Sequence, residues 1–154
     1  MRPFLQLYAV FIVGGLILSL ARATPHPVAP LSPLANGTQV RASSYDQHRN
    51  NHPLFAIDGQ LGPLQWRPAP TDAAPWIEVV FESGVAVESV SISPRQRQGE
   101  VRCYDASGTL LATAEFEVAH RALSCAAAHR VEVRFPAASK PRVGEIVVHT
   151  VAAQ

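Results

Sequence analysis

Hydrophobic and polar residues alternate along most of the chain after its first 40 residues, and this pattern predicts β-strands. Ile77, Val79 and Phe81 fall on one face of such a strand, with polar or smaller residues between them. The alternation returns at residues 131–135 and 145–149. After residue 23 no segment repeats apolar positions with a convincing helical period. Short strands at regular spacing predict an all-β sandwich or jelly roll.

Turn signals separate the expected strands. Ser83-Gly84 is predicted to turn the chain, and Ala106-Ser107-Gly108 is predicted to form a tight turn into a partner strand at 109–116. Between these turns the apolar positions switch from odd to even numbers, which predicts a bulge at Glu88-Ser89. The alanine-rich stretch 111–128 leaves room for one helical turn.

The N-terminus has the features of a secretory signal peptide. Arg2 gives a positive start, residues 4–20 are mostly apolar, and Ala21-Arg22-Ala23 matches a signal peptidase site. We expect residues 1–23 to be removed before Thr24, so that the protein is secreted, either extracellular or periplasmic. The alternative is an uncleaved anchor, for which the apolar run is slightly short.

The rest of the chain reads as a linker followed by one domain. Four prolines between Thr24 and Pro33 predict an extended linker at 24–35, outside the core, and a single domain at 36–152. Without its signal peptide the chain keeps 11 of its 13 basic residues against 12 acidic ones. This charge balance gives no basic surface for nucleic acid or anionic membranes, and no stable membrane span is expected after processing.

The chain has two cysteines, Cys103 and Cys125. In an oxidising compartment an even pair predicts a disulfide, although two buried free thiols are the alternative. Closing a loop of this size would stabilise the fold by about 3 kcal/mol in the chain-entropy model.

Several motifs together resemble the discoidin domain. They are Ala42-Ser43-Ser44-Tyr45, Ala56-Ile57-Asp58-Gly59, Trp66, the strand Trp76-Ile77-Glu78-Val79-Val80-Phe81, and Val143-Gly144-Glu145-Ile146. This family, also called the coagulation-factor type C domain, belongs to the galactose-binding-like superfamily. The resemblance implies a jelly-roll β-sandwich of about eight antiparallel strands that binds a ligand without catalysis. The family tryptophan that matches Trp66 is usually buried, and the alternative is an exposed Trp66 that stacks on a sugar face. Trp76 precedes an expected buried strand, so we expect it in the core as well.

The resemblance implies a structural calcium ion beside the D-G turn. Carbohydrate-binding relatives hold calcium there with an Asp, a nearby hydroxyl and a Glu on the last strand. Asp58 and Glu145 match the two acids, and carboxylates are suitable Ca²⁺ ligands. The hydroxyl has no counterpart in residues 60–65, so a metal-free turn is the alternative.

Two polar segments are candidates for ligand contact. The first contains Tyr45, His48, Arg49 and Asn50, in a loop that the family places at the ligand-binding end of the sandwich. Guanidinium and amide groups donate hydrogen bonds to sugar hydroxyls in fixed geometry. A solvated loop is the alternative reading.

The second candidate segment contains Arg95 and Arg97, just after the strand that ends near Ile92. Two arginines at this position could hold a carboxylate or sulfate bidentately. The alternative is a solvated hairpin loop.

The sequence contains no G-x-S-x-G, H-E-x-x-H or phosphate-loop motif. We therefore expect a secreted, non-catalytic module that binds carbohydrate, with a glycan or an extracellular or cell-surface protein as its partner. The alternative is an adhesion or structural domain that binds protein or a membrane surface. In that case Leu61, Leu64 and Trp66 would form an apolar loop tip.

Overall fold

The computed structural model describes residues 28–30, 37–47, 50–93, 98–116 and 120–151. These residues contain seven β-strands and a short 3₁₀-helix, η2 (Pro53–Ala56). The strands are β1 (Val28–Pro30), β2 (Gln39–Ala42), β3 (Trp76–Ser93), β4 (Gly99–Tyr104), β5 (Leu110–Phe116), β6 (His120–Arg134) and β7 (Glu145–Val151). Every strand pair is antiparallel, which confirms the all-β prediction. Within the described ranges, no helix has the length and apolar character needed to cross a membrane.

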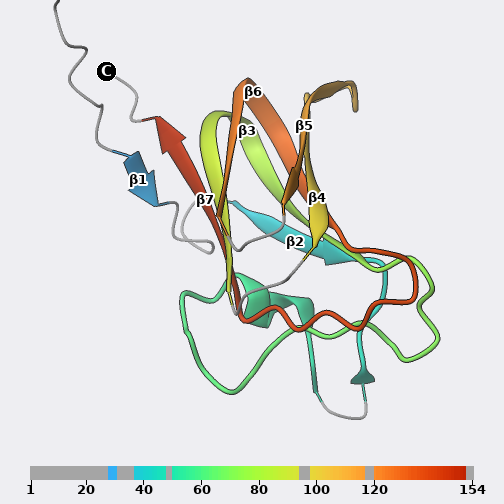
Figure 1. Cartoon of the computed structure of the whole chain (residues 1–154). Coiled ribbons are helices and arrows are strands. Elements are labelled where there is room, and N and C mark those ends of the chain that lie inside the picture. Colours follow the sequence, from blue (N-terminus) through green and yellow to red (C-terminus); the bar gives the residue numbers. More distant parts are fainter. Residues whose placement is uncertain (1–27, 31–36, 48–49, 94–97, 117–119, 152–154) are drawn as a thin grey trace, which may run out of the picture.

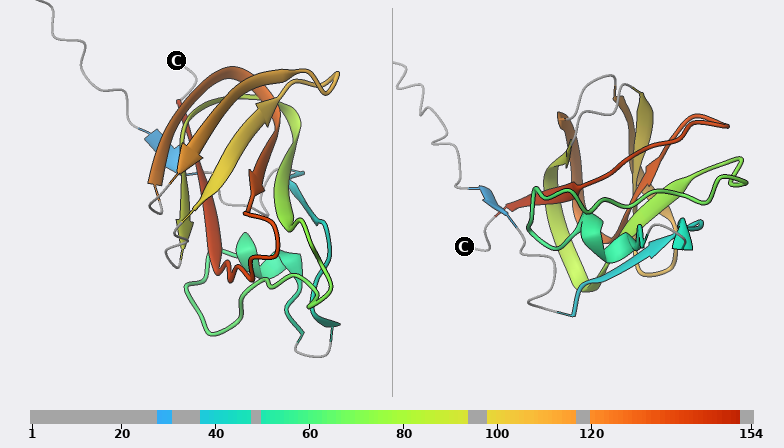
Figure 2. Two further views of the ribbon diagram at one scale, coloured as in Figure 1. Left: turned by 45° about the vertical axis from the view of Figure 1, so that its right-hand side comes forward. Right: turned by 90° about the horizontal axis from the view of Figure 1, so that it is seen from below.

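The strands form two layers because β3 and β6 bend and run through both. The first part of β3 pairs with β2 and the last part of β6, whereas its last part pairs with β7 and the first part of β6. We call one layer the front layer: it contains β2, the first part of β3, the last part of β6, and then β4 and β5. The back layer contains the first part of β6, the last part of β3, and then β7 and β1. Figures 1 and 2 show β3 and β6 arching together from one layer to the other. We call this the arched end, and the opposite end, where η2 and the long connections gather, the loop end.

The bend in β3 replaces the turn predicted at Ser83-Gly84. The strand continues through these residues, and its pairing with β6 shifts register between Val80 and Val85 and again beyond. Gly84 lies close to β6 here, since a Cβ at this position would lie 3.1 Å from His129 Nε2. The predicted turn is therefore wrong, because the glycine serves a bend within one strand. The bulge predicted at Glu88-Ser89 is confirmed by a register shift between Val87 and Ser89.

The alanine-rich stretch is strand wherever it is described, so the helical turn left open there is not found in β5 or β6. Alanine has the highest helix propensity, but pairing with neighbouring strands overrides that preference. The small alanine side chain also suits the place where the bent parts of β3 and β6 pack closely together. Ala127 Cβ would lie 3.6 Å from a Cβ added at Gly84.

The core lies between the layers and is built by the predicted alternation. Ile77, Val79, Val131 and Val133 all point inward and are at most 3% exposed. They pack with buried residues of the back layer such as Val90. Side chains of successive strand residues point to opposite faces, so the residues between them form the outer face of the front layer.

A disulfide between Cys103 and Cys125 confirms the predicted pairing. The two Cα atoms are 6.7 Å apart, within the usual range of about 4.4–6.8 Å. Cys103 pairs in register with Val131 in the front layer, whereas Cys125 pairs with Val87 in the back layer. The bond therefore joins the two layers directly.

The predicted linker differs from the structure in one respect. Residues Val28–Pro30 form β1, which pairs with the end of β7 at residues 149–151. Part of the proline-rich stretch thus extends the back layer, although it was expected to lie outside the domain. The predicted signal peptide at 1–23 lies outside the described residues.

Candidate functional site

The long connections converge at the loop end, where hydrogen bonds between their backbones hold them together. Trp66 and Val143 exchange two bonds, of 2.7 and 3.0 Å between N and O. Asp46 N donates to Arg67 O at 2.9 Å, and Gly144 N donates to Ser93 O at 2.7 Å. Segments from four parts of the sequence therefore form one surface there (Figure 1).

The two serines of the Ala42-Ser43-Ser44-Tyr45 motif hold one of these connections. Both hydroxyls donate to Asp72 Oδ2, at 2.5 Å each, and they accept from the backbone N–H groups of Trp76 and Ala69. Burial would raise the pKa of Asp72, but the hydrogen bonds from the serines and from Ala74 lower it instead. The motif thus has a structural role, and its partner lies 28 residues away in the sequence.

Three aromatic rings close the core at the loop end. Phe135 packs 6.0 Å from Trp66 and 6.4 Å from Phe116, measured between ring centroids. Trp66 is fully buried, as predicted, and its Nε1 donates to Ser44 O at 2.9 Å. Trp76, also expected in the core, is instead partly exposed at the start of β3.

Because Trp66 is buried, it cannot belong to the apolar loop tip that the adhesion alternative required. Leu61 is 78% exposed and Leu64 is 48% exposed, so only these two of the three residues reach the surface. The surface available for an apolar contact is correspondingly smaller.

Of the first predicted ligand segment, Tyr45 and Asn50 are described, whereas His48 and Arg49 lie outside the described residues. Tyr45 is half-buried and packs edge-to-face on His52, with ring centroids 5.1 Å apart. His52 Nδ1 accepts a hydrogen bond from Leu54 N at 3.1 Å and so caps η2. Asn50 is exposed and has a positive φ of 51°. Ligand contact by these residues stays a prediction.

Of the second predicted segment, neither Arg95 nor Arg97 is described. Their segment leads directly into Gln98 and the start of β4 at Gly99.

The two predicted calcium ligands lie together at the D-G turn. Glu145 Oε2 accepts a hydrogen bond from Gly59 N at 3.1 Å, and Asp58 Oδ1 accepts one from Gln60 N at 2.9 Å. Burial, together with the nearby negative charge of Asp58, raises the pKa of Glu145 to about 7. No cluster of three or more His, Cys, Asp or Glu side chains suited to a metal occurs in the described part of the chain. An ion here would thus need backbone carbonyls in addition to the two carboxylates.

A groove of about 500 Å³ opens at the loop end of the front layer, across β4, β5 and β6. Residues of both charges line it: Glu100, Arg102, Glu115 and Arg134. Arg102 Nη2 lies 2.6 Å from Glu100 Oε2, and Thr113 Oγ1 donates to Glu100 Oε1 at 2.7 Å. These two hydrogen bonds lower the pKa of Glu100, so its carboxylate stays ionised.

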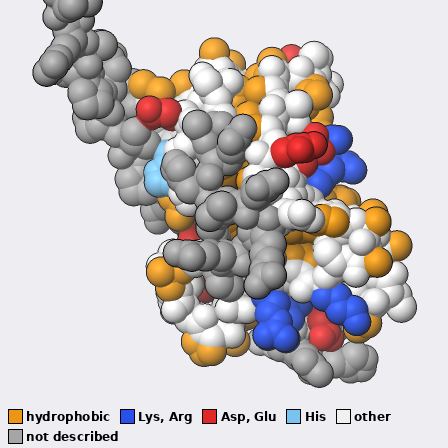
Figure 3. Space-filling model, in the orientation of Figure 1, with side chains coloured by type: hydrophobic (Ala, Val, Ile, Leu, Met, Phe, Trp, Pro, Cys, Tyr) orange, Lys and Arg blue, Asp and Glu red, His pale blue; other side chains and the backbone are white. Residues whose placement is uncertain are grey.

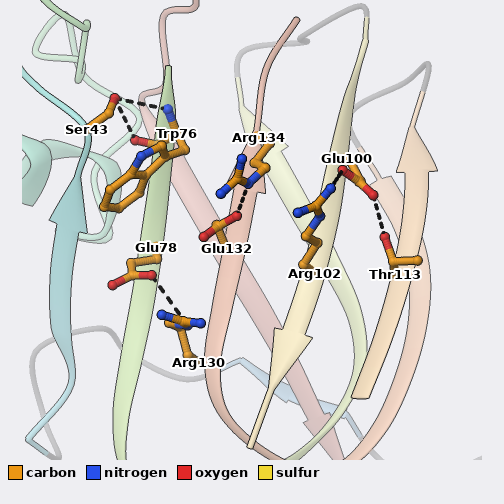
Figure 4. Close-up of polar contacts among 9 residues, drawn as sticks. All are labelled: Ser43, Trp76, Glu78, Glu100, Arg102, Thr113, Arg130, Glu132 and Arg134. Carbon is orange, nitrogen blue, oxygen red and sulfur yellow. Dashed lines mark hydrogen bonds and ion pairs between the residues drawn. The ribbon is translucent and has the colours of Figure 1, made fainter. Parts of the chain in front are cut away.

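Two further features shape the groove. Gly99 leaves room for the ring of Phe116, because a Cβ at Gly99 would overlap that ring. Arg134 is paired through its Nε with Glu132, a carboxylate that is only 5% exposed (Figure 4). The groove therefore offers ionised groups that are already held in place beside an aromatic ring. Sequence reasoning missed it, because the pairing of β4 with both β5 and β6 brings its lining together, and a local pattern does not show which strands pair.

The face shown in Figure 3 carries basic, acidic and apolar side chains in small groups. No large patch of one charge dominates its described part.

The fold can be compared with known structures. No protein-family model and no curated protein sequence matches the chain. Several solved structures, however, have a similar fold. A mutant of the lectin binding domain of lectinolysin, in complex with Lewis b, superposes with a TM-score of 0.67 at 17% identity, covering 82% of this chain and 100% of that one.

Two bacterial modules are also similar. A fucose binding module of Streptococcus pneumoniae gives a TM-score of 0.64 at 18% identity, with 79% of this chain and 100% of the module covered. The third module of carbohydrate-binding family 32 from a family 31 glycoside hydrolase of Clostridium perfringens gives 0.64 at 10% identity, covering 79% and 94%. The chain has the β-sandwich fold of carbohydrate-binding modules. At these identities the likeness establishes the fold alone, which agrees with the predicted β-sandwich, and the resemblance to the discoidin domain stays a prediction.

Proposed function

We propose that this protein is a non-catalytic carbohydrate-binding module that takes a sugar in the groove at the loop end. The observation that carries the proposal is this groove, with its paired carboxylates and guanidinium groups, on a sandwich shared with lectin and fucose-binding modules. A concave site with a few convergent polar groups is the usual form of a small-molecule site.

The groove has the chemistry that a sugar needs. Glu100 and Glu115 can accept hydrogen bonds from sugar hydroxyls, and Arg102 and Arg134 can donate to sugar oxygens. Phe116 is only 3% exposed, so its ring lies beneath the groove and offers little apolar surface to a sugar. Because a shallow polar groove buries little apolar surface, we expect dissociation constants of about 10 μM to 1 mM.

We further propose that Arg95 and Arg97 add to this site, since their segment joins the groove residue Gln98 in the sequence. Tyr45, His48, Arg49 and Asn50 would contact the same ligand only if it extends across the loop end.

For the D-G turn we propose a structural Ca²⁺ ion held by Asp58 and Glu145. An ion would neutralise the negative charge of these two neighbouring carboxylates, and it would hold the turn against β7.

Millimolar CaCl₂ should raise the melting temperature of the protein, and Mg²⁺ should not. Asp58→Asn should abolish that increase. An equal increase in the variant would mean that calcium acts elsewhere, and no increase in either protein would favour the metal-free turn.

Residence outside the cytoplasm is also proposed. The disulfide fits an oxidising compartment. N-terminal sequencing of exported protein should find Thr24 as the first residue, whereas an intact Met1 in the membrane fraction would indicate an anchor.

A glycan array probed with the labelled protein tests the main proposal. We expect binding to at least one class of glycan, and Glu115→Gln should weaken it at least fivefold without changing the melting temperature. Glu88→Gln is the matched control, because Glu88 is an exposed glutamate of β3 in the back layer. Absence of binding to any glycan, or equal loss in both variants, would contradict the proposed site.

A further inference from the structure

The groove is one end of a longer row of side chains that crosses the front layer. Trp76 on β3 pairs in register with Arg134 on β6, Arg134 with Glu100 on β4, and Glu100 with Glu115 on β5. Residues in register on neighbouring strands share a face, so all four belong to the outer face. Figure 4 shows three of them, Trp76, Arg134 and Glu100. Neighbouring strands lie about 4.8 Å apart, so the row spans about 14 Å, which is longer than one pyranose ring.

Trp76 gives this row an aromatic end outside the groove. It is partly exposed, and Ser43 Oγ accepts a hydrogen bond from its backbone N at 3.1 Å (Figure 4). A partly exposed indole presents a flat apolar surface on which the face of a sugar ring can stack. The aromatic ring and the groove thus lie at opposite ends of the same row.

Buried carboxylates hold the arginines of this face. Glu132 pairs with Arg134, and Glu78, only 3% exposed, pairs with Arg130 Nε at 3.5 Å and with Arg41 Nη1 at 3.8 Å. An arginine held in this way loses less side-chain entropy when it binds a ligand. The row is therefore organised before any ligand arrives.

The charges of the face balance. The strands of the front layer place four arginines on it, Arg41, Arg102, Arg130 and Arg134. They also place four glutamates there, Glu78, Glu100, Glu115 and Glu132. A face without net charge gives no electrostatic preference to sulfated or uronate chains, or to chains of amino sugars.

We infer that the row from Trp76 to Glu115 binds an uncharged oligosaccharide chain of several units, with the groove as one subsite and Trp76 as the far one. The inference rests on the proposed glycan function, and it names the form of the ligand. The chain lies across the strands, and its units contact the indole, the guanidinium of Arg134 and the carboxylates in turn.

Titration calorimetry with the intact protein tests this. The probes are neutral cello-, manno- and galacto-oligosaccharides of one to six units, together with any neutral glycan selected by the array. Affinity should rise at least tenfold from one unit to four. Oligogalacturonate and chitosan oligomers of equal length should bind no more tightly than the best neutral chain.

Trp76 variants locate the far subsite. Trp76→Leu should remove most of the gain with length while leaving the affinity for a single unit unchanged, and Trp76→Phe should retain much of the gain. Glu88→Gln is the control, and melting curves identify any variant that fails to fold. Because the length series on the parent protein needs no variant, it decides the matter even if Trp76→Leu unfolds.

Each outcome has a distinct meaning. Equal affinity for one and four units overturns the extended site and leaves the glycan function intact. Tighter binding of either charged chain overturns the assignment of an uncharged ligand. Failure of every glycan, neutral or charged, overturns the proposed function itself.

Discussion

The two faces of the front layer bury opposite kinds of side chain to the same extent. On the inner face, Ile77 and Val131 are fully buried. On the outer face, Glu78 and Glu132 are nearly as inaccessible, although they are carboxylates. They lie next to each other on neighbouring strands, with arginines beside them.

The comparison separates two uses of burial. Apolar burial on the inner face stabilises the sandwich by roughly 25 cal/mol per Å² removed from water. Burial of a carboxylate costs desolvation free energy, which the paired arginines offset only in part. The inner face therefore determines stability, and we interpret the outer face as a surface held in position for a ligand.

The largest expected effect comes from the inner face. Ile77→Ala should lower the free energy of unfolding by about 2–5 kcal/mol, because the truncation leaves a cavity in the core. Val80→Ala, on the outer face of the same strand, is the control and should cost clearly less. Urea denaturation of both variants measures the difference. Similar losses of unfolding free energy at the two positions would mean that the inner and outer faces contribute equally to stability.

The disulfide gives the next effect. Cys103→Ser with Cys125→Ser should lower the free energy of unfolding by about 3 kcal/mol, because the bond closes a loop of 22 residues. Glycan binding should persist at temperatures where the double variant is folded, since neither sulfur lies in the groove. If binding disappears while the fold is intact, the connection between layers also shapes the outer face.

The inner face could be predicted from the sequence, because a period of two assigns each strand residue to one side. The alternation correctly placed Val79 and Val133 inward. It also placed Glu78 and Glu132 outward, but it could not show that they would be buried. That burial depends on arginines from other strands, and pairing between strands distant in sequence is not visible in a local pattern.

The predicted turn at Ser83-Gly84 and the role of the two serines show the same limit. Glycine permits a turn, but it also permits close packing of two strands, and only the tertiary structure distinguishes the two. Ser43 and Ser44 were identified as part of a family motif, whereas their acceptor, Asp72, carries no sequence signal.

Glu78 allows a finer test of the outer face. Burial raises its pKa, Arg130 and Arg41 lower it in part, and the charge of Glu132 raises it further. A folded-state pKa above the unfolded value means that this group contributes stability below the unfolded pKa, near 4.5, and that the contribution is lost as pH rises through the folded pKa. Glu78→Gln should therefore match the parent at pH 4 and be more stable than the parent at pH 7, where only the parent has an ionised, desolvated carboxylate.

Urea denaturation of the parent and Glu78→Gln at a series of pH values measures this difference. The remaining pH dependence, including that of Glu145, is common to both proteins and cancels. A Gln variant that is less stable than the parent at pH 7 would show that the ion pairs outweigh the desolvation cost.

The smallest effect on stability should come from the groove. Glu100 and Arg102 form an ion pair whose side chains are about 30% exposed, and exposed pairs contribute less than about 1 kcal/mol. Glu100→Gln should therefore leave the free energy of unfolding almost unchanged. It should nevertheless weaken glycan binding at least fivefold, because Arg102 loses the carboxylate that orients it and the sugar loses an acceptor. Thr113→Val, which removes only the hydroxyl that donates to Glu100, should have a smaller effect in the same direction. Loss of stability without loss of binding would assign the pair to the fold and contradict its role in the groove.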